Sequence, residues 1–275
     1  MLTSSKSLSC CICGSSVGSK VYKQIDSHEL LRCLECQLVR LSRVAISPEE
    51  FLSDAAEQTD GKVEYWGYPE YFKKYADVFN HFFEDRFEKI NSHLEIDGEW
   101  LDVGSGYGLW QKYLKNKKQK SFGIEIETKA FSFAQGDGVD IELVSIQSFK
   151  TEKRFAAITM CDVLEHVEEP LEVLQKCKDL LLPGGMLYIQ VPNVIGFKYP
   201  YGDTLGLPHH LWQFNPRTLQ LLTQKAGFQT IKAWTGIQGV IRYYEQGGPS
   251  LWRLGLWKLA RLTGRGNRLQ LLVRK

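Results

Sequence analysis

The sequence lacks long apolar runs and carries little net charge. No segment approaches the ~20 consecutive apolar residues that span a bilayer, and Met1–Ser9 has no apolar core of the kind that a signal peptide needs. The 34 Lys and Arg residues nearly balance the 32 Asp and Glu residues, so no strong global field favours nucleic acid or a membrane as partner. We therefore expect a cytoplasmic protein without a transmembrane segment.

Internal repeats and low-complexity tracts are also absent, and composition divides the 275 residues into three parts. Residues 1–45 hold five of the seven cysteines. Residues 46–95 carry apolar residues at steps of three or four, which predicts a long helix that begins near Pro69. Residues 96–275 alternate short apolar runs with helical segments. We expect a small N-terminal module, a helical connector and one large α/β domain.

The cysteines of the first part are spaced as metal ligands. In a reducing cytoplasm they are not expected to form disulfides. Cys10-x-x-Cys13 and Cys33-x-x-Cys36 form two knuckles separated by 19 residues, a spacing typical of tetrahedral zinc sites. Cys11 is left as a spare thiol. Four thiolates fill the coordination sphere, so the sequence predicts a zinc ribbon whose metal is structural.

The third part has the pattern of a doubly wound α/β domain. Strands are predicted at 99–103, 120–125, 139–144, 155–160, 186–191, 228–235 and 268–274, and helices near 107–117, 128–135, 170–182 and 215–226. This alternation predicts a mostly parallel seven-stranded sheet with ligands at the carboxyl ends of its strands.

A glycine-rich loop follows the first of these strands. In Leu101–Gly108 an apolar strand runs into three glycines at alternate positions and then into a helix. The glycines let the backbone turn sharply and approach a ligand. The next strand ends about twenty residues later at Glu125, where a carboxylate can bind both ribose hydroxyls. A tight turn without a ligand is the alternative for the loop alone.

Together with the loop and Glu125, the runs Ile158–Pro170 and Leu181–Asn193 resemble class I, Rossmann-like methyltransferases that depend on S-adenosylmethionine. The resemblance covers roughly residues 96–235. It includes bacterial sugar and small-molecule methyltransferases and the ubiquinone-biosynthesis O-methyltransferases. A similar zinc module precedes the catalytic domain in a group of sugar C-methyltransferases.

The resemblance implies a cofactor site. Asp102, Gly104, Ser105 and Gly106 would line the methionine portion of S-adenosylmethionine, and Glu125 would bind its ribose. The remaining implied residues are Ile126 and Ile146 or Gln147, which would flank the adenine, and Cys161, which would lie below the cofactor. For Cys161 a plain buried position at a strand end is the alternative.

Three histidines are candidate catalytic residues. If the acceptor is a hydroxyl, the protein must accept its proton, and imidazole has a suitable pKa. His166 lies just past the fourth strand of the domain, and His209 and His210 follow the 193–208 loop, where acceptors bind in the family. Structural roles are the alternative for all three.

Asp162, Glu165 and His166 also lie three and four residues apart, so one helical turn would aim them at a common point. The ubiquinone-biosynthesis enzymes use a Glu-x-x-Glu-His arrangement for a divalent cation, and this chain has Asp at the first position. The resemblance therefore raises a magnesium site at these residues, with loop-positioning hydrogen bonds as the alternative.

Two further segments have open interpretations. Aromatic residues crowd 63–72 and indicate a lid over the cofactor or simple packing of the helix that follows. Residues 251–262, within a basic stretch near 250–263, predict an amphipathic helix with basic residues on one side. Such a helix contacts a membrane peripherally, binds phosphates, or packs on its own domain.

The sequence predicts a methyltransferase that acts on a small-molecule or sugar-like (glycan) acceptor. The first alternative is an RNA methyltransferase that grips nucleic acid with its zinc ribbon, but residues 10–45 carry no dense basic stripe. The second is a non-catalytic protein that binds S-adenosylmethionine. Neither the acceptor's identity nor the oligomeric state follows from the sequence.

Overall fold

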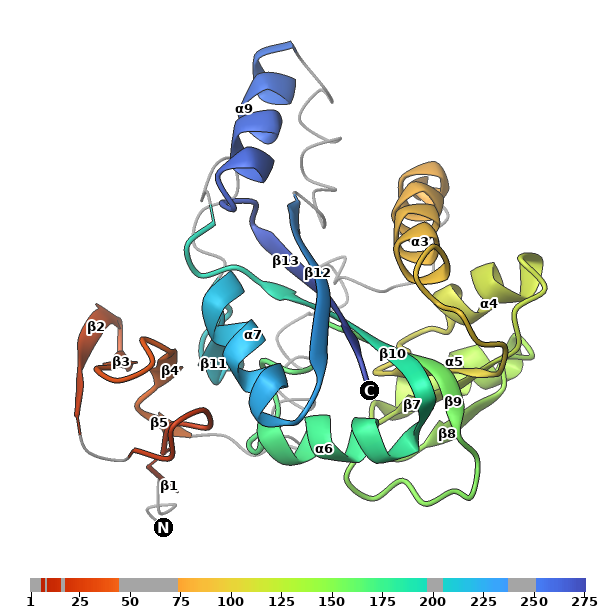
Figure 1. The fold of residues 1–275 in the computed structure, drawn as a ribbon, viewed down its shortest axis with the longest axis horizontal. Coiled ribbons are helices and arrows are strands. Elements are labelled where there is room, and N and C mark those ends of the chain that lie inside the picture. The colour runs from red at the N-terminus through yellow and green to blue at the C-terminus, as the bar shows by residue number, and fades with distance from the viewer. Residues whose placement is uncertain (1–5, 8, 16–17, 45–73, 197–204, 237–250) are drawn as a thin grey trace.

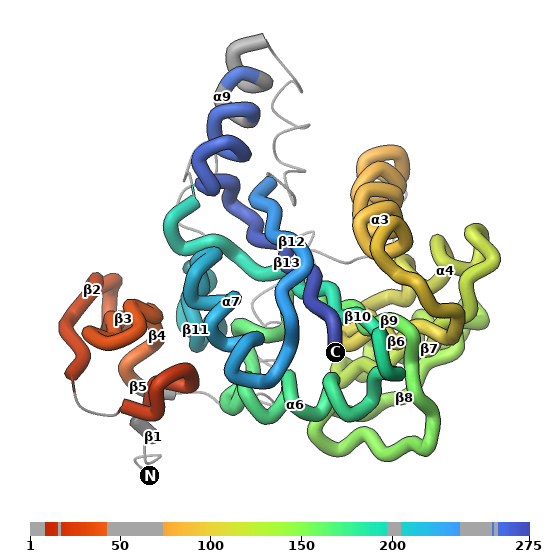
Figure 2. Tube along the Cα trace, viewed as in Figure 1, coloured from red at the N-terminus to blue at the C-terminus, as the bar shows by residue number. Residues whose placement is uncertain are grey.

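The computed structural model describes residues 6–7, 9–15, 18–44, 74–196, 205–236 and 251–275. Figure 1 shows an α/β body, a small β module beside it at the N-terminal end, and helix α9 (Leu251–Leu262) projecting from the body. The chain trace in Figure 2 shows the same arrangement. The predicted aromatic lid and the predicted boundary at residue 45 lie outside the described residues.

The body is built on a seven-stranded sheet of order β12-β13-β10-β9-β6-β7-β8. Its strands are β6 (Trp100–Val103), β7 (Ser121–Glu125), β8 (Ile141–Leu143), β9 (Phe155–Cys161), β10 (Leu181–Pro192), β12 (Gln229–Gly236) and β13 (Arg268–Arg274). The β8–β7–β6–β9–β10 neighbours pair in parallel, and β13 runs antiparallel between β10 and β12. The predicted doubly wound, mostly parallel seven-stranded sheet is confirmed.

Strand β10 is longer than predicted. Leu181 pairs with Phe155, and the register then shifts before Met186 pairs with Ala157. The intervening Pro-Gly-Gly turn carries no alternating apolar pattern, so the sequence signal begins only after it.

Helices cover both faces of the sheet. They are α3 (Ala76–Asn91), α4 (Leu109–Asn116), α5 (Thr128–Gly136), α6 (Pro170–Leu180) and α7 (Pro216–Lys225). Because successive strand residues point to opposite faces, Trp100 joins a core cluster with Ile90 and Trp110. Leu101 instead joins the cluster that contains Leu174 of α6 and Leu219 of α7. The carboxyl ends of the parallel strands are thus held from both sides.

The N-terminal module contains β2 (Ser19–Ile25), β3 (His28–Cys33) and β4 (Val39–Leu41), and a short pair formed by β1 (Lys6–Ser7) and β5 (Arg43–Val44). A strand from the far part of the chain, β11 (Trp212–Gln213), completes its sheet in the order β11-β4-β3-β2. One core cluster includes residues of both parts, among them Cys33, Leu38 and Trp212. The module therefore shares its core with the α/β domain.

The predicted amphipathic helix is present as α9. Ala260 is buried, whereas the side chains of Leu259 and Leu262 are 49% and 85% exposed. Of these three apolar residues, only Ala260 is covered. In the described part of the chain no helix is both long and apolar enough to cross a membrane.

Candidate active site

The glycine loop lies at the carboxyl end of β6 and leads into α4. Gly104, Gly106 and Gly108 have φ angles of 74°, 52° and 70°, in the left-handed region that favours glycine. A Cβ at Gly104 would lie 2.4 Å from Val163, whereas a Cβ at Gly106 would meet no atom within 4 Å. Gly104 is therefore needed for close packing, and the backbone at Gly106 borders open space.

Glu125 connects the glycine loop to the end of β7. Its buried carboxylate accepts a hydrogen bond from the backbone N–H of Gly106 through Oε2 at 2.6 Å. Oε1 accepts from the backbone N–H groups of Ile126 and Glu127 at 2.7 and 2.9 Å. The carboxylate predicted to bind ribose therefore lies directly beside the loop.

Asp102 of the central strand β6 is buried, and its side chain belongs to a series of hydrogen-bonded side chains. Its Oδ1 accepts from the Thr159 hydroxyl at 2.5 Å, and Thr159 in turn accepts from the indole N–H of Trp110 at 3.2 Å. Burial raises the pKa of Asp102 to about 6, against the opposing effects of Arg86 and the Thr159 hydrogen bond. At pH 5, below this pKa, the Asp102 carboxyl is therefore mostly protonated.

Arg86 of α3 was not among the predicted site residues. Its guanidinium lies 4.8 to 5.9 Å from the ring centroids of three aromatic residues, Phe83, Trp110 and Tyr188. Burial alone would lower the pKa of Arg86, but the nearby ionisable groups of Cys161, Tyr188 and Asp102 raise it. Among the described residues no carboxylate forms an ion pair with Arg86, so this cation at the site edge suits an anionic ligand group. In the sequence Arg86 could have been noticed as a basic residue at helical spacing from the apolar residues Phe83 and Ile90 of α3.

The other predicted cofactor contacts surround the same edge. Ser105 is buried, and its hydroxyl donates to the backbone oxygen of Asp102 at 2.9 Å. Ile126 is 48% exposed just past β7, whereas Ile146 is buried and Gln147 is exposed. Cys161 ends β9, and burial raises the pKa of its thiol to about 12, which fits a neutral wall of the site.

The structure brings two of the three predicted histidines together with a buried carboxylate. Ligand atoms of Glu165, His166 and His210 all lie within 4.8 Å of one another, and we call these three residues the histidine cluster. The two imidazole rings meet edge to face with centroids 4.7 Å apart. Neither carboxylate oxygen of Glu165 has a hydrogen-bond partner in the described part of the chain. Burial and the charge of Asp162 raise the pKa of Glu165 well above its ordinary value.

Hydrogen bonding fixes the tautomer of His166. Its Nδ1 lies 3.1 Å from the backbone oxygen of His209. A carbonyl oxygen only accepts, so Nδ1 carries the proton, and Nε2 is the basic nitrogen of the neutral ring. Burial lowers the pKa of His166 and brings that of His210 to about 2. His209 contributes its carbonyl, and its ring is not a member of the cluster.

Asp162 lies apart from the cluster. Its backbone is left-handed, with φ of 56°, and its carboxylate accepts a hydrogen bond from Gln190 at 3.1 Å and pairs with Arg268 at 3.4 Å. The set predicted for magnesium is thus divided, because Glu165 and His166 gather with His210 and not with Asp162. The sequence spacing could not indicate that His210, 44 positions after His166, takes the place predicted for Asp162.

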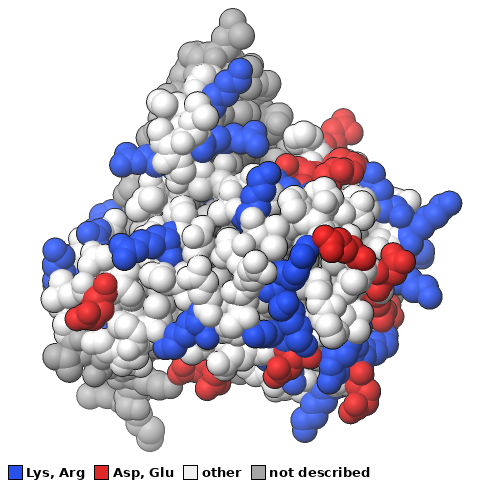
Figure 3. Space-filling view, viewed as in Figure 1, with Lys and Arg blue, Asp and Glu red and all other residues white. Residues whose placement is uncertain are grey.

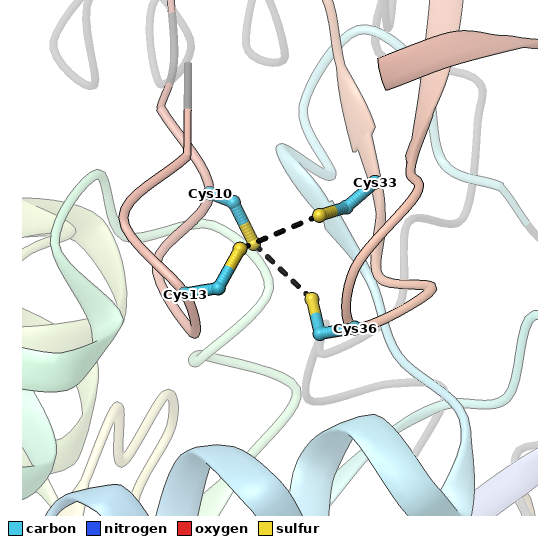
Figure 4. A group of neighbouring side chains, drawn as sticks. All are labelled: Cys10, Cys13, Cys33 and Cys36. Atoms are coloured by element: carbon cyan, nitrogen blue, oxygen red, sulfur yellow. Dashed lines mark hydrogen bonds between the residues drawn. The ribbon is translucent and has the colours of Figure 1, made fainter. Parts of the chain in front are cut away.

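The four predicted zinc ligands converge from two knuckles (Figure 4). Sulfur–sulfur distances are 3.3 Å between Cys10 and Cys36 and 3.4 Å between Cys13 and Cys33. Burial alone would raise the pKa of the Cys33 thiol, but backbone N–H groups and neighbouring thiols lower it to about 7. Cys11 is not in the group. Burial and the neighbouring thiols raise the pKa of Cys13 and Cys36, so the metal site is supported by geometry: four thiols around one centre fit a tetrahedral zinc ion.

Comparison with known proteins identifies the family. Residues 68–233 match the family described as "Methyltransferase domain". The chain belongs to this methyltransferase family. The methyltransferase is 28% identical over 181 residues to the "Ubiquinone biosynthesis O-methyltransferase" of Chromobacterium violaceum, covering 58% of this chain and 78% of that one. The protein of the same name from Xanthomonas euvesicatoria is 28% identical, with 52% and 68% covered.

Solved structures confirm the fold of the methyltransferase. A SAM-dependent methyltransferase from Archaeoglobus fulgidus superposes with a TM-score of 0.54 at 17% identity, over 74% of this chain and 99% of that one. The 1,6-didemethyltoxoflavin-N1-methyltransferase of Burkholderia thailandensis gives 0.53 at 14% identity, over 94% and 99%. The predicted class I fold and the predicted S-adenosylmethionine-dependent methyltransferase activity are both confirmed.

Proposed function

We propose that the methyltransferase methylates a hydroxyl of a small-molecule or sugar-like acceptor that binds over the histidine cluster. The observation that carries this proposal is the convergence of Glu165, His166 and His210 just past the carboxyl end of β9. Two relatives named as O-methyltransferases in ubiquinone biosynthesis support a small acceptor with an oxygen nucleophile.

The cofactor would bind along the sheet edge. Asp102, Gly104, Ser105 and Gly106 would line its methionine portion, Glu125 would bind its ribose, and Ile126, Ile146 and Gln147 would surround its adenine. Arg86 would hold the methionine carboxylate, because it is the cation without an ion pair at this edge of the described residues. When bound, S-adenosylmethionine supplies a methyl group activated by its sulfonium.

His166 would accept the acceptor's proton. Its Nδ1–H is oriented by the His209 carbonyl, which leaves Nε2 as the basic atom. In its ionised form Glu165 would stabilise the imidazolium that forms, and that positive charge would in turn lower the raised pKa of Glu165. His210 would pack edge to face against His166 and limit its rotation.

A divalent cation held by the histidine cluster is the competing arrangement. One carboxylate and two imidazoles suit manganese, iron or zinc better than magnesium, which prefers oxygen ligands. Turnover measured after chelation and after addition of manganese separates the two arrangements. Turnover that survives chelation supports the metal-free base, and turnover that returns only with the metal contradicts it.

The acceptor class is tested by incubating the full chain with methyl-labelled S-adenosylmethionine and panels of phenols, sugars, nucleotide sugars and RNA. We expect label in a hydroxyl-bearing small molecule. On the face shown in Figure 3, Lys and Arg lie in separate groups with Asp and Glu among them, which does not favour RNA. Label in RNA alone would support the alternative RNA methyltransferase, and cofactor binding without transfer to any panel would support the non-catalytic alternative.

We also propose that Cys10, Cys13, Cys33 and Cys36 bind one structural zinc ion. The four sulfurs fit this ion, and its binding free energy would stabilise the two knuckles. Elemental analysis of protein purified without chelators should find one zinc per chain, unchanged in Cys11→Ala. A zinc-free wild-type chain would contradict the assignment.

A further inference from the structure

The zinc ribbon, defined here as residues 10–44, shares a sheet with the segment that carries His210 of the histidine cluster. Trp212 and Gln213 of β11 pair with Arg40 and Val39 of β4. The backbone N–H of Leu41 donates to the backbone oxygen of Leu211 at 2.9 Å. β11 is therefore held from two sides: by β4, and by the α/β domain, where the Trp212 indole N–H donates to the backbone oxygen of Val167 at 2.7 Å.

From β11, hydrogen bonds continue to the histidine cluster. The backbone N–H groups of Leu211 and Trp212 donate to the backbone oxygen of Glu165 at 2.8 and 3.2 Å. The side-chain amide of Gln213, which is buried, donates to the backbone oxygens of Leu205 and His210 at 2.7 and 3.2 Å. The same short segment therefore connects the ribbon to both the Glu165 and the His210 sides of the cluster.

Packing reinforces this connection. The ribbon residues Leu38 and Leu41 belong to the same buried cluster as Leu211 and Trp212. On the other side of the ribbon, the Lys225 ammonium at the end of α7 donates to the backbone oxygen of Ile12, in the first knuckle, at 2.5 Å. A displacement of the knuckles therefore cannot leave the 205–213 segment unchanged, because close-packed interiors transmit strain.

The predicted cofactor-binding residues Glu125 and Asp102 make no hydrogen bond to the ribbon among the described residues. The hydrogen bonds of the Glu125 carboxylate all come from backbone N–H groups of its own turn and of the glycine loop. Asp102 is held by Thr159 within the large sheet. Both groups are hydrogen-bonded within the α/β domain. Val103 and Ile124 do belong to the same buried cluster as Leu38 of the ribbon, so the two halves of the site differ in their hydrogen bonds.

We propose that the metal-loaded ribbon is a positioning element of the acceptor side: loss of its metal releases β11 and the histidine cluster while S-adenosylmethionine binding persists. This inference rests on the proposed catalytic role of the cluster for its functional meaning. The coupling itself is physical and is measured without an acceptor.

The test compares three variants of the full chain. Cys13 is the exposed member of the four thiols, so Cys13→Ala removes a ligand without opening a core cavity. Cys13→His restores a fourth donor, as in Cys₃His zinc sites, and Cys11→Ala changes the same knuckle outside the ligand set. Hydrogen exchange reports the protection of residues 205–214, and calorimetry reports the affinity for S-adenosylhomocysteine.

In Cys13→Ala we expect exchange across 205–214 to rise about tenfold or more, because the opening free energy of this segment falls. Peptides of β6 and β9 should exchange as in wild type, and S-adenosylhomocysteine should bind within about twofold of wild type. Cys13→His and Cys11→Ala should retain wild-type protection. Unchanged exchange in a zinc-free Cys13→Ala chain, or loss of cofactor binding, would overturn the proposal.

A second variant keeps the metal and breaks the connection. Gln213→Leu retains the backbone pairing with Val39 but loses both amide hydrogen bonds, so exchange should rise at 205–210 with zinc content unchanged. Protection equal to wild type would contradict a positioning role for Gln213. If the exchange results hold while His166→Ala turns over normally, the coupling stands and the proposed base fails. If the reverse holds, the base stands and the coupling fails.

Discussion

Gly206 lies against the imidazole of His210: a Cβ placed on Gly206 would come within 2.3 Å of His210 Cε1. Gly206 also has a φ of 57°. The absence of a side chain therefore allows both this left-handed backbone conformation and the close approach of the His210 ring. The position of His210 in the cluster therefore depends on a glycine four residues before it.

Gly206→Ala should displace the His210 ring and lower kcat about 10- to 100-fold, because misplacement of a catalytic group by about 1 Å has effects of this size. Gly264→Ala is the matched control. It has a φ of 69° and no atom within 4 Å of its added Cβ, so it should lose only about 1–2 kcal/mol through backbone strain. Steady-state kinetics with the acceptor found by methyl labelling measures both. Equal kcat values in the two variants would contradict the positioning of His210.

The three predicted histidines should differ in their effects. His166→Ala should lower kcat about 10²- to 10⁴-fold, the usual range for loss of a general base. His209→Ala should have a smaller effect, because the bond to His166 uses the backbone carbonyl, which the variant keeps. Affinity for S-adenosylhomocysteine should remain near wild type in both. A larger loss in His209→Ala than in His166→Ala would reverse the assignment.

Part of this site was open to prediction from the sequence. Apart from β10, the strand bounds agree closely because each strand is a short apolar run between turn residues, as in β13, which was predicted at its observed bounds. The glycine loop and Glu125 carry a local signal, since both lie at strand ends, where ligands are expected to bind. The four cysteines likewise reveal their grouping through spacing alone.

Other features depend on contacts between distant segments. The pairing of β11 with β4 involves two residues without any periodic pattern. His210 reaches Glu165 because the 205–211 segment folds back over the end of β9. Asp162 turns toward Gln190 of β10 and Arg268 of β13, which are far from it in the sequence. The position of Arg86 in the apolar stripe of α3 is visible in the sequence, but its three aromatic neighbours are not.

The pKa of Asp102 gives a pH dependence of stability. Its folded value is raised from 3.8 to about 6. Between these values the folded chain keeps a proton that the unfolded chain has lost, so this stabilisation is present below the unfolded pKa. It is lost as pH rises through the folded pKa and amounts to about 3 kcal/mol.

Asp102→Asn should remove this dependence while keeping an acceptor for Thr159. Denaturant unfolding at pH 4 and at pH 7 measures it. The free energy of unfolding of wild type, relative to that of the variant, should fall by about 2 kcal/mol between the two pH values, because at pH 4 part of the full effect is already lost. A difference that does not change with pH would show that Asp102 titrates normally.

Binding of S-adenosylhomocysteine to Gly106→Val, measured by calorimetry, tests the cofactor site most directly. The space beside Gly106 is open, with no atom within 4 Å of an added Cβ, and a valine would occupy it. The control is Gly136→Val at the end of α5, where an added Cβ also meets nothing within 4 Å and φ is not positive. We predict binding within about twofold of wild type for Gly136→Val and at least about 100-fold weaker binding for Gly106→Val, a loss of about 3 kcal/mol. Wild-type affinity in a folded Gly106→Val chain, or preferential binding of NAD by the wild type, would contradict the account.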